Sequence, residues 1–216
     1  MLSYELVPNL SGPVILGSPE TLQSFHEILH DVNERSPIIR DKEGVFLGLA
    51  YDVRKAFEGQ RIIRKPARNV MHSGPRLGFE ILWPTILVQS RMLRVALGFM
   101  DSGKRHQAFA YALEAVVEEA LQVEFPAEYS DIHERWLRLL PDQPVLEEKT
   151  ESRIEHWYHW TKPQRRRGII PLLESLDPMF EFDYQMAVKH GEKVFMSPEE
   201  WDAIEGSDDA SSDTGH

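Results

Sequence analysis

Two long helices joined by a very short link largely determine what this chain can fold into. The spacing of apolar residues predicts helices over Thr85–Met100 and Lys104–Val123, separated by Asp101, Ser102 and Gly103. Such a short link requires the two helices to run antiparallel as a helical hairpin. The first of them is apolar nearly all round, so we expect it to be the central, most buried helix.

The residues before this hairpin predict a small antiparallel sheet. Alternation at 4–7 and an apolar run at 14–16, with turn residues between them, indicate a β-hairpin, and further strands are expected near 61–64 and 78–83. Helices are expected from Ser18, a good N-cap, to before Pro37, and from residue 44 to 57. The fold class that follows is α+β and helix-dominant, with the sheet packed against a helical bundle.

The chain after the hairpin predicts more helices and a few strands. Helices are expected at 126–140, 145–160 and 169–176, strands around 179–184 and 192–196, and a short helix after Ser197. We expect one globular domain over residues 1–205, with its sheet-forming part at about 1–83 and its helical part at about 84–205. Residues 206–216 hold no aliphatic residue larger than alanine and predict a disordered acidic tail.

Charge is distributed unevenly along the chain. The net charge is −11, yet residues 54–105 hold 11 Lys and Arg against 3 Asp and Glu. Acidic helices could neutralise this basic stretch within the fold, or it could form a face for an anionic partner. For the second case the candidate anion- or partner-binding residues are Arg61, Arg64, Lys65, Arg68, Arg165, Arg166 and Arg167. The total charge predicts that any binding to nucleic acid is weak.

A short histidine motif lies on the first predicted helix. His26, Glu27 and His30 form a His-Glu-x-x-His string that resembles the signature of zincin metallopeptidases. The resemblance implies that His26 and His30 would bind zinc and that Glu27 would be the catalytic base. A third ligand would have to come from Glu34 or from a distant histidine. The plain alternative is a half-exposed helix face without metal.

Two arginines interrupt the apolar central helix and need a partner if they are buried. Folding the hairpin about Ser102 places Arg91 opposite Glu114 and Arg94 near Ala110 and Tyr111. We therefore predict a structural role for Arg91, Arg94 and Glu114, with an anion-binding pocket as the alternative.

Aromatic and cationic residues gather between 156 and 167. Aromatic stacking with cations is typical of single-stranded nucleic-acid binding and of protein hot spots. Helical spacing gives a plainer interpretation, with Trp157 in the core and Arg165–Arg167 in a solvated turn.

These observations favour a non-enzymatic interaction or regulatory protein of the inhibitor, immunity or assembly-factor type, with a protein partner. A zinc-dependent hydrolase and an accessory nucleic-acid-contacting protein are the alternatives. The chain has no cysteine and no apolar run free of charge long enough to span a membrane, so we expect it in the cytoplasm. Its oligomeric state is left open.

Overall fold

The computed structural model describes residues 1–65 and 74–203. Arg68 and the predicted tail at 206–216 lie outside these residues. The strands are β1 (Ser3–Leu6), β2 (Pro13–Gly17), β3 (Ile62–Arg64) and β4 (Arg76–Glu80). The helices are α1 (Pro19–Arg35), α2 (Val45–Phe57), α3 (Trp83–Ala96), α4 (Lys104–Glu124), α5 (Tyr129–Arg138), α6 (Pro144–His159), α7 (Lys162–Glu174), α8 (Phe180–Lys189) and α9 (Pro198–Asp202).

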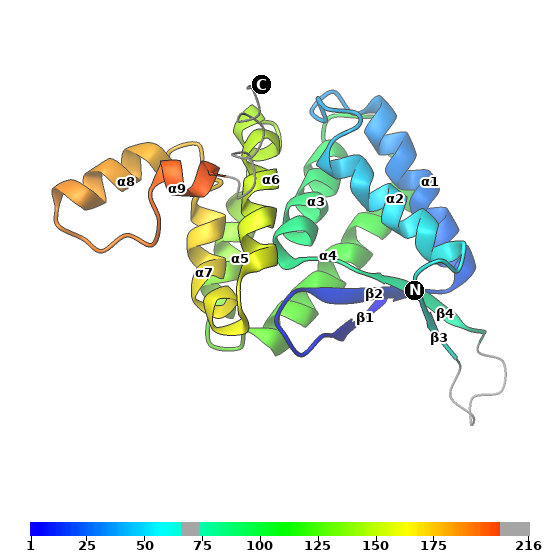
Figure 1. Cartoon of the computed structure of the whole chain (residues 1–216). Helices are drawn as coiled ribbons and strands as arrows, with labels where there is room; N and C mark the ends of the chain where they lie inside the picture. Colours follow the sequence, from blue (N-terminus) through cyan, green and yellow to red (C-terminus); the bar gives the residue numbers. More distant parts are fainter. Residues whose placement is uncertain (66–73, 204–216) are drawn as a thin grey trace, which may run out of the picture.

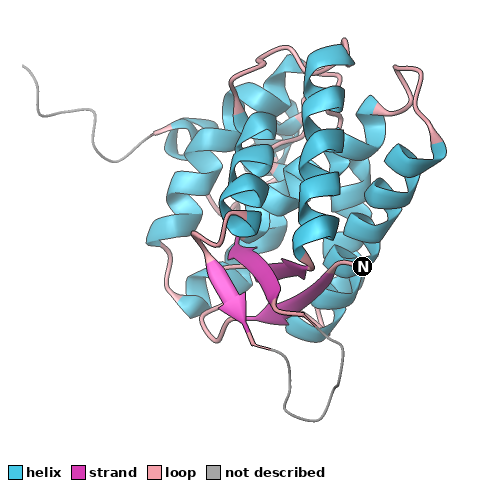
Figure 2. Cartoon of the chain, turned by 90° about the vertical axis from the view of Figure 1, so that its right-hand side faces the viewer, coloured by secondary structure: helices cyan, strands magenta, loops and turns pink. Residues whose placement is uncertain are grey.

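The predicted sheet is confirmed as a small antiparallel sheet with the strand order β1-β2-β4-β3. It lies across one end of the helical layer (Figure 2). Ile15 pairs with Phe79 at its centre, and both side chains are completely buried. Gly78 allows the close approach of β2 to β4, because a Cβ atom there would lie 2.3 Å from the carbonyl oxygen of Ile15. The α+β, helix-dominant fold class is therefore correct.

The helical hairpin is also confirmed, with α3 as the buried helix (Figure 1). Along α3 the residues Ile86, Leu87, Val88, Met92 and Leu93 are completely buried. Helices α2, α4, α5 and α6 all pack against α3. The indole Nε1 of Trp136, on α5, donates a hydrogen bond to the carbonyl of Leu87 at 2.9 Å. Among the described helices, none combines the length and hydropathy needed to cross a bilayer.

The prediction of strands around 179–184 and 192–196 is wrong. Residues 180–189 form helix α8, and residues 192–196 are irregular. The alternation of Phe180, Phe182 and Tyr184 with acidic residues has the period of a strand, but the described sheet is built from β1 to β4 and does not include these residues. The helix instead brings Phe180 and Tyr184 onto one face, with their ring centroids 6.4 Å apart.

Candidate functional site

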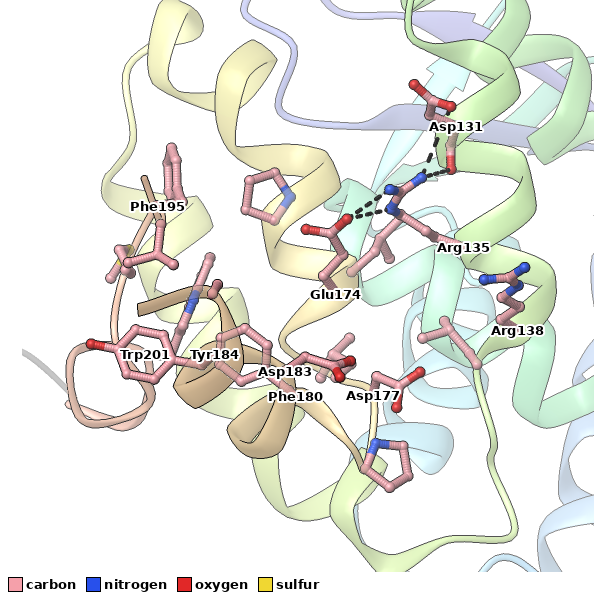
Figure 3. Close-up of a pocket in the computed structure, with 18 of the residues that line it drawn as sticks. Asp131, Arg135, Arg138, Glu174, Asp177, Phe180, Asp183, Tyr184, Phe195 and Trp201 are labelled. Carbon is pink, nitrogen blue, oxygen red and sulfur yellow. Dashed lines mark hydrogen bonds and ion pairs between the residues drawn. The ribbon is translucent and has the colours of Figure 1, made fainter. Parts of the chain in front are cut away.

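A cleft of about 630 Å³ lies beside helices α5 and α7. Its other wall is formed by residues 177–203, which comprise α8, α9 and the connecting loops and which we call the C-terminal arm. Figure 3 shows the cleft, and Figure 1 shows that α8 projects away from the other helices. The cleft is therefore built between the helical body and a peripheral segment.

The far end of the arm is fastened to the body by Arg153, which lies on α6 and is completely buried. Its guanidinium donates hydrogen bonds to Ser175 Oγ at 3.0 Å, to the carbonyl of Trp201 at 3.2 Å, and to the carboxylate of Asp202. Burial lowers the pKa of Arg153, and the neighbouring Asp202 opposes that shift. Because a buried guanidinium needs such partners, this network fixes the position of α9.

An aromatic cluster supports the same attachment. Trp201 is completely buried, and the ring centroids of Trp160, Phe195 and Trp201 lie 5.7 to 6.0 Å from one another. Gly168 on α7 makes room for this cluster, because a Cβ atom there would lie 2.3 Å from the Trp160 ring. The end of the arm is thus part of the protein core.

Helix α8 differs sharply from the end of the arm. All ten of its residues are described, and none of them is buried. Phe182 is 56% exposed and Val188 is 51% exposed, and Met179, just before the helix, is 54% exposed. Met179, Phe182 and Met186 follow helical spacing, so they form one apolar stripe on α8 that lies outside the cleft. Contiguous apolar surface of this kind is typical of interaction sites.

The cleft combines apolar walls with charged groups at its mouth. Arg135 on α5 donates to Glu174 at 2.7 Å and lies 4.0 Å from Asp131 (Figure 3), and Arg138 lies 2.6 Å from Glu134. Leu139, Leu173 and Leu176 form the buried floor, and Phe180, Tyr184 and Phe195 come from the arm. Such a cleft can bind the apolar side chains of a segment and fix its orientation through charges at the edge.

The histidine motif lies on α1, remote from this cleft. The rings of His26 and His30 are 4.4 Å apart between centroids, and Glu27 lies 3.1 Å from Arg105 across to α4. Burial lowers the pKa of His26, and the positive charges of His30 and Arg54 add to this effect. Within residues 1–65 and 74–203, no group of three or more His, Cys, Asp or Glu side chains is arranged to hold a metal ion.

The basic residues of the β3 region are engaged with nearby carboxylates. Arg61 lies 3.0 Å from Asp52, and Arg64 donates to Glu5 through both Nε and Nη2. Lys65 is exposed. This basic stretch is therefore neutralised in part within the fold, as one of the two interpretations of the charge distribution expects.

The prediction of a solvated turn at residues 165–167 is wrong, because these residues lie within α7. Arg165 is buried and donates to the backbone carbonyls of Trp157, Asn9 and Tyr158. Arg166 contacts Glu128 at 3.2 Å, and Arg167 is exposed. Helix α7 begins earlier than expected because Thr161 forms a capping box with Gln164. The three arginines consequently point to different surroundings and form no common patch.

The arginines of α3 lie against Glu114 of α4. Nη1 of Arg91 is 3.7 Å and Nε of Arg94 is 3.5 Å from the carboxylate oxygens of Glu114. The guanidinium of Arg94 also stacks on Tyr111, at 3.6 Å from the ring centroid. Burial raises the pKa of Glu114, and the two guanidinium groups oppose that shift. The charged side chains of Arg91, Arg94 and Glu114 are therefore engaged with one another or with Tyr111 inside the fold.

Sequence reasoning missed the cleft itself and the residues that hold the arm. Arg153 and Asp202 are 49 positions apart, and no spacing rule connects them. Only the start of α9 gave a signal, since Ser197 and Glu200 form a capping box at its N-terminus.

Comparison with known proteins adds a family but no activity. Neither the curated proteins nor the solved structures include a match to this chain. A protein family described as "Domain of unknown function (DUF6904)" matches residues 2–170, which cover the sheet, the helical hairpin and most of α7. The C-terminal arm lies after the matched residues. Because the match covers more than half of the sequence, the chain belongs to this family of unknown function.

Proposed function

We propose that this protein is a non-enzymatic interaction protein that binds a segment of a protein partner with its C-terminal arm. The observation that carries the proposal is the exposure of α8. This helix holds five large apolar or aromatic residues, a sixth, Met179, directly precedes it, and none of the residues of the helix is buried. The free energy falls when a binding partner removes hydrophobic surface of this kind from water.

The attachment of the arm supports the same function. Arg153 and Trp201 hold its far end in the core, so α8 is presented on a fixed base. A binding surface that is already ordered loses less conformational entropy when a partner binds. The cleft beside α8 supplies apolar walls on one side, and the stripe of Met179, Phe182 and Met186 supplies a second apolar surface. A partner segment could therefore contact the arm from both sides.

We place the protein in the cytoplasm, because a chain without cysteine depends on no disulfide and tolerates a reducing environment. Its principal partner is a protein. The negative net charge supports this choice, since it opposes binding to the phosphate backbone of a nucleic acid.

Site-specific photo-crosslinking in the native host tests the proposal. A photoreactive phenylalanine analogue replaces Phe182 or Met186 on α8, and Tyr51 or Phe99 in matched control variants. Tyr51 is 47% and Phe99 is 53% exposed, so the controls present a probe with similar access to solvent far from the arm.

We expect a discrete protein adduct from both α8 positions and none from the control positions. Mass spectrometry of the adduct identifies the partner. Adducts of equal yield at all four positions, or none at α8, would contradict the proposal.

A further inference from the structure

We infer that the segment bound in the cleft is cationic and amphipathic, with lysine or arginine beside large apolar residues. This inference rests on the proposed function and names the chemistry of the partner. It follows from three properties of the described residues, namely the charge at the edge of the cleft, the chemistry of its walls and the charge of the whole arm.

The charge at the edge of the cleft is negative and partly uncompensated. Six carboxylates and three cationic side chains line it, but Arg135 and Arg138 are paired with carboxylates of the cleft itself. Asp177, Asp183 and Glu192 make no ion pair with any described residue. Three carboxylates against Lys193 therefore remain for a ligand, and a cationic side chain would complement them.

The walls of the cleft suit the stems and heads of such side chains. Phe180 and Tyr184 are half-buried and line the cleft from α8, and Phe195, which is 45% exposed, lines it from the following loop. Figure 3 shows these rings on the arm side and Asp183 beside them. Aromatic faces attract ammonium and guanidinium groups, and they also bind the methylene stems of lysine and arginine. The leucines of the floor favour an apolar residue on the same segment.

The charge of the arm favours this partner over a second copy of the chain. Residues 177–203 hold seven Asp and Glu against two Lys, and the whole chain has a net charge of −11. A two-fold contact would place the same surface of two subunits together, so it would bring two acidic arms side by side. A basic segment is instead attracted over a distance and associates faster at low ionic strength.

A peptide-binding experiment with the full chain tests the inference. The probe is a fluorescent peptide of about 16 residues, or about four helical turns, with leucine and lysine at amphipathic spacing. A peptide with glutamate in place of lysine is the charge control. Binding is measured by fluorescence anisotropy at two salt concentrations.

Two triple variants separate the cleft from the overall charge. The cleft variant carries Asp177→Asn, Asp183→Asn and Glu192→Gln, which keep the side-chain sizes. The control variant carries Glu34→Gln, Glu43→Gln and Glu119→Gln, which are exposed and lie outside the cleft. Both variants remove three negative charges, so they alter non-specific attraction equally. Circular dichroism establishes that each is folded.

We expect the lysine peptide to bind, and the cleft variant to weaken binding about tenfold, as three partly exposed ion pairs would. The control variant should weaken it less than about threefold, because distant exposed charges are screened by salt. Equal losses in both variants, equal binding of the glutamate peptide, or no binding of the lysine peptide would overturn the inference. A dimer in sedimentation that the cleft variant dissociates would also overturn it, in favour of a second copy. If the peptide fails while crosslinking at Phe182 still captures a partner, the proposed function stands and the cationic partner does not.

Discussion

The substitution Arg153→Met tests how the arm is held. The native guanidinium is completely buried and joins α6 to Ser175 at the end of α7 and to Trp201 and Asp202 in α9. Methionine has a similar length and fills much of the same volume, so the substitution removes the hydrogen bonds and the charge with little change in packing.

The contacts set the expected loss of stability. Removing one partner of a buried ion pair costs about 3–5 kcal/mol when the other charge stays buried. The Asp202 side chain is 48% exposed, so water can solvate its carboxylate, and the lower end of that range applies. The hydroxyl of Ser175 and the carbonyl of Trp201 lose buried donors, at about 1 kcal/mol each. We therefore expect Arg153→Met to lower the free energy of unfolding by about 3–5 kcal/mol, where the lower value counts the ion pair alone and the upper value adds the two hydrogen bonds.

Urea unfolding followed by tryptophan fluorescence measures this loss, and amide hydrogen exchange locates it. Exchange should accelerate most in residues 180–202, because these lose their attachment to α6. Arg138→Met is the matched control, since this arginine is exposed and pairs with Glu134 one turn away on α5. The control should change stability by less than about 0.5 kcal/mol. An unfolding midpoint of Arg153→Met equal to that of the wild type, with unchanged exchange in the arm, would refute the reasoning.

Three further predictions concern the histidine motif and the aromatic cluster. Because burial holds the pKa of His26 below its usual value near 6.5, the unfolded chain takes up this proton at a higher pH than the folded protein. The wild type should consequently lose stability relative to His26→Gln as the pH falls below about 6.5, and parallel urea curves for the two proteins between pH 7.5 and pH 5 would contradict this. Gly168→Ala should lower the free energy of unfolding by about 1–3 kcal/mol, because the Cβ atom of the alanine would displace the Trp160 ring. Urea unfolding measures this loss. A variant as stable as the wild type would contradict the prediction and show that the ring moves freely. Protein purified without a histidine tag should contain well below one equivalent of zinc by elemental analysis. The reason is that His26 and His30 supply only two of the three protein ligands that a catalytic zinc requires. Stoichiometric zinc that is lost in the His26→Ala variant would refute this prediction.

Local patterns were sufficient to predict most of the fold. The all-round apolar character of residues 85–96 identified the buried helix, because such a helix is stable only when neighbours cover every face. Ser18 marked the start of α1, where its side chain accepts a hydrogen bond from the amide of Thr21. Alternation at the N-terminus predicted β1 and β2, because these residues do have a sheet to join.

The same rules failed where tertiary contacts decide the outcome. Alternating aromatic residues at 180–184 suggested a strand, but they form helix α8, from which Phe180 and Tyr184 line the cleft. The cleft depends on pairs that are distant in sequence, such as Arg135 with Glu174, and on the attachment of Arg153 to α9. Spacing along the chain carries no information about such pairs, so this candidate site required the three-dimensional structure.

The residue at which the family match ends separates the parts of the cleft that could select a ligand by its charge. The matched residues 2–170 supply the α5 wall, where Arg135 is already paired with two neighbouring carboxylates and adds little net charge. Asp177, Asp183 and Glu192 all come after the match, so the uncompensated charge of the cleft belongs to the arm. A ligand chosen by charge would therefore be chosen by the arm, because charged groups that are already paired contribute little to selectivity. It follows that membership of the family accounts for the sheet and the helices within residues 2–170, whereas the sequence of the C-terminal arm would determine which partner binds.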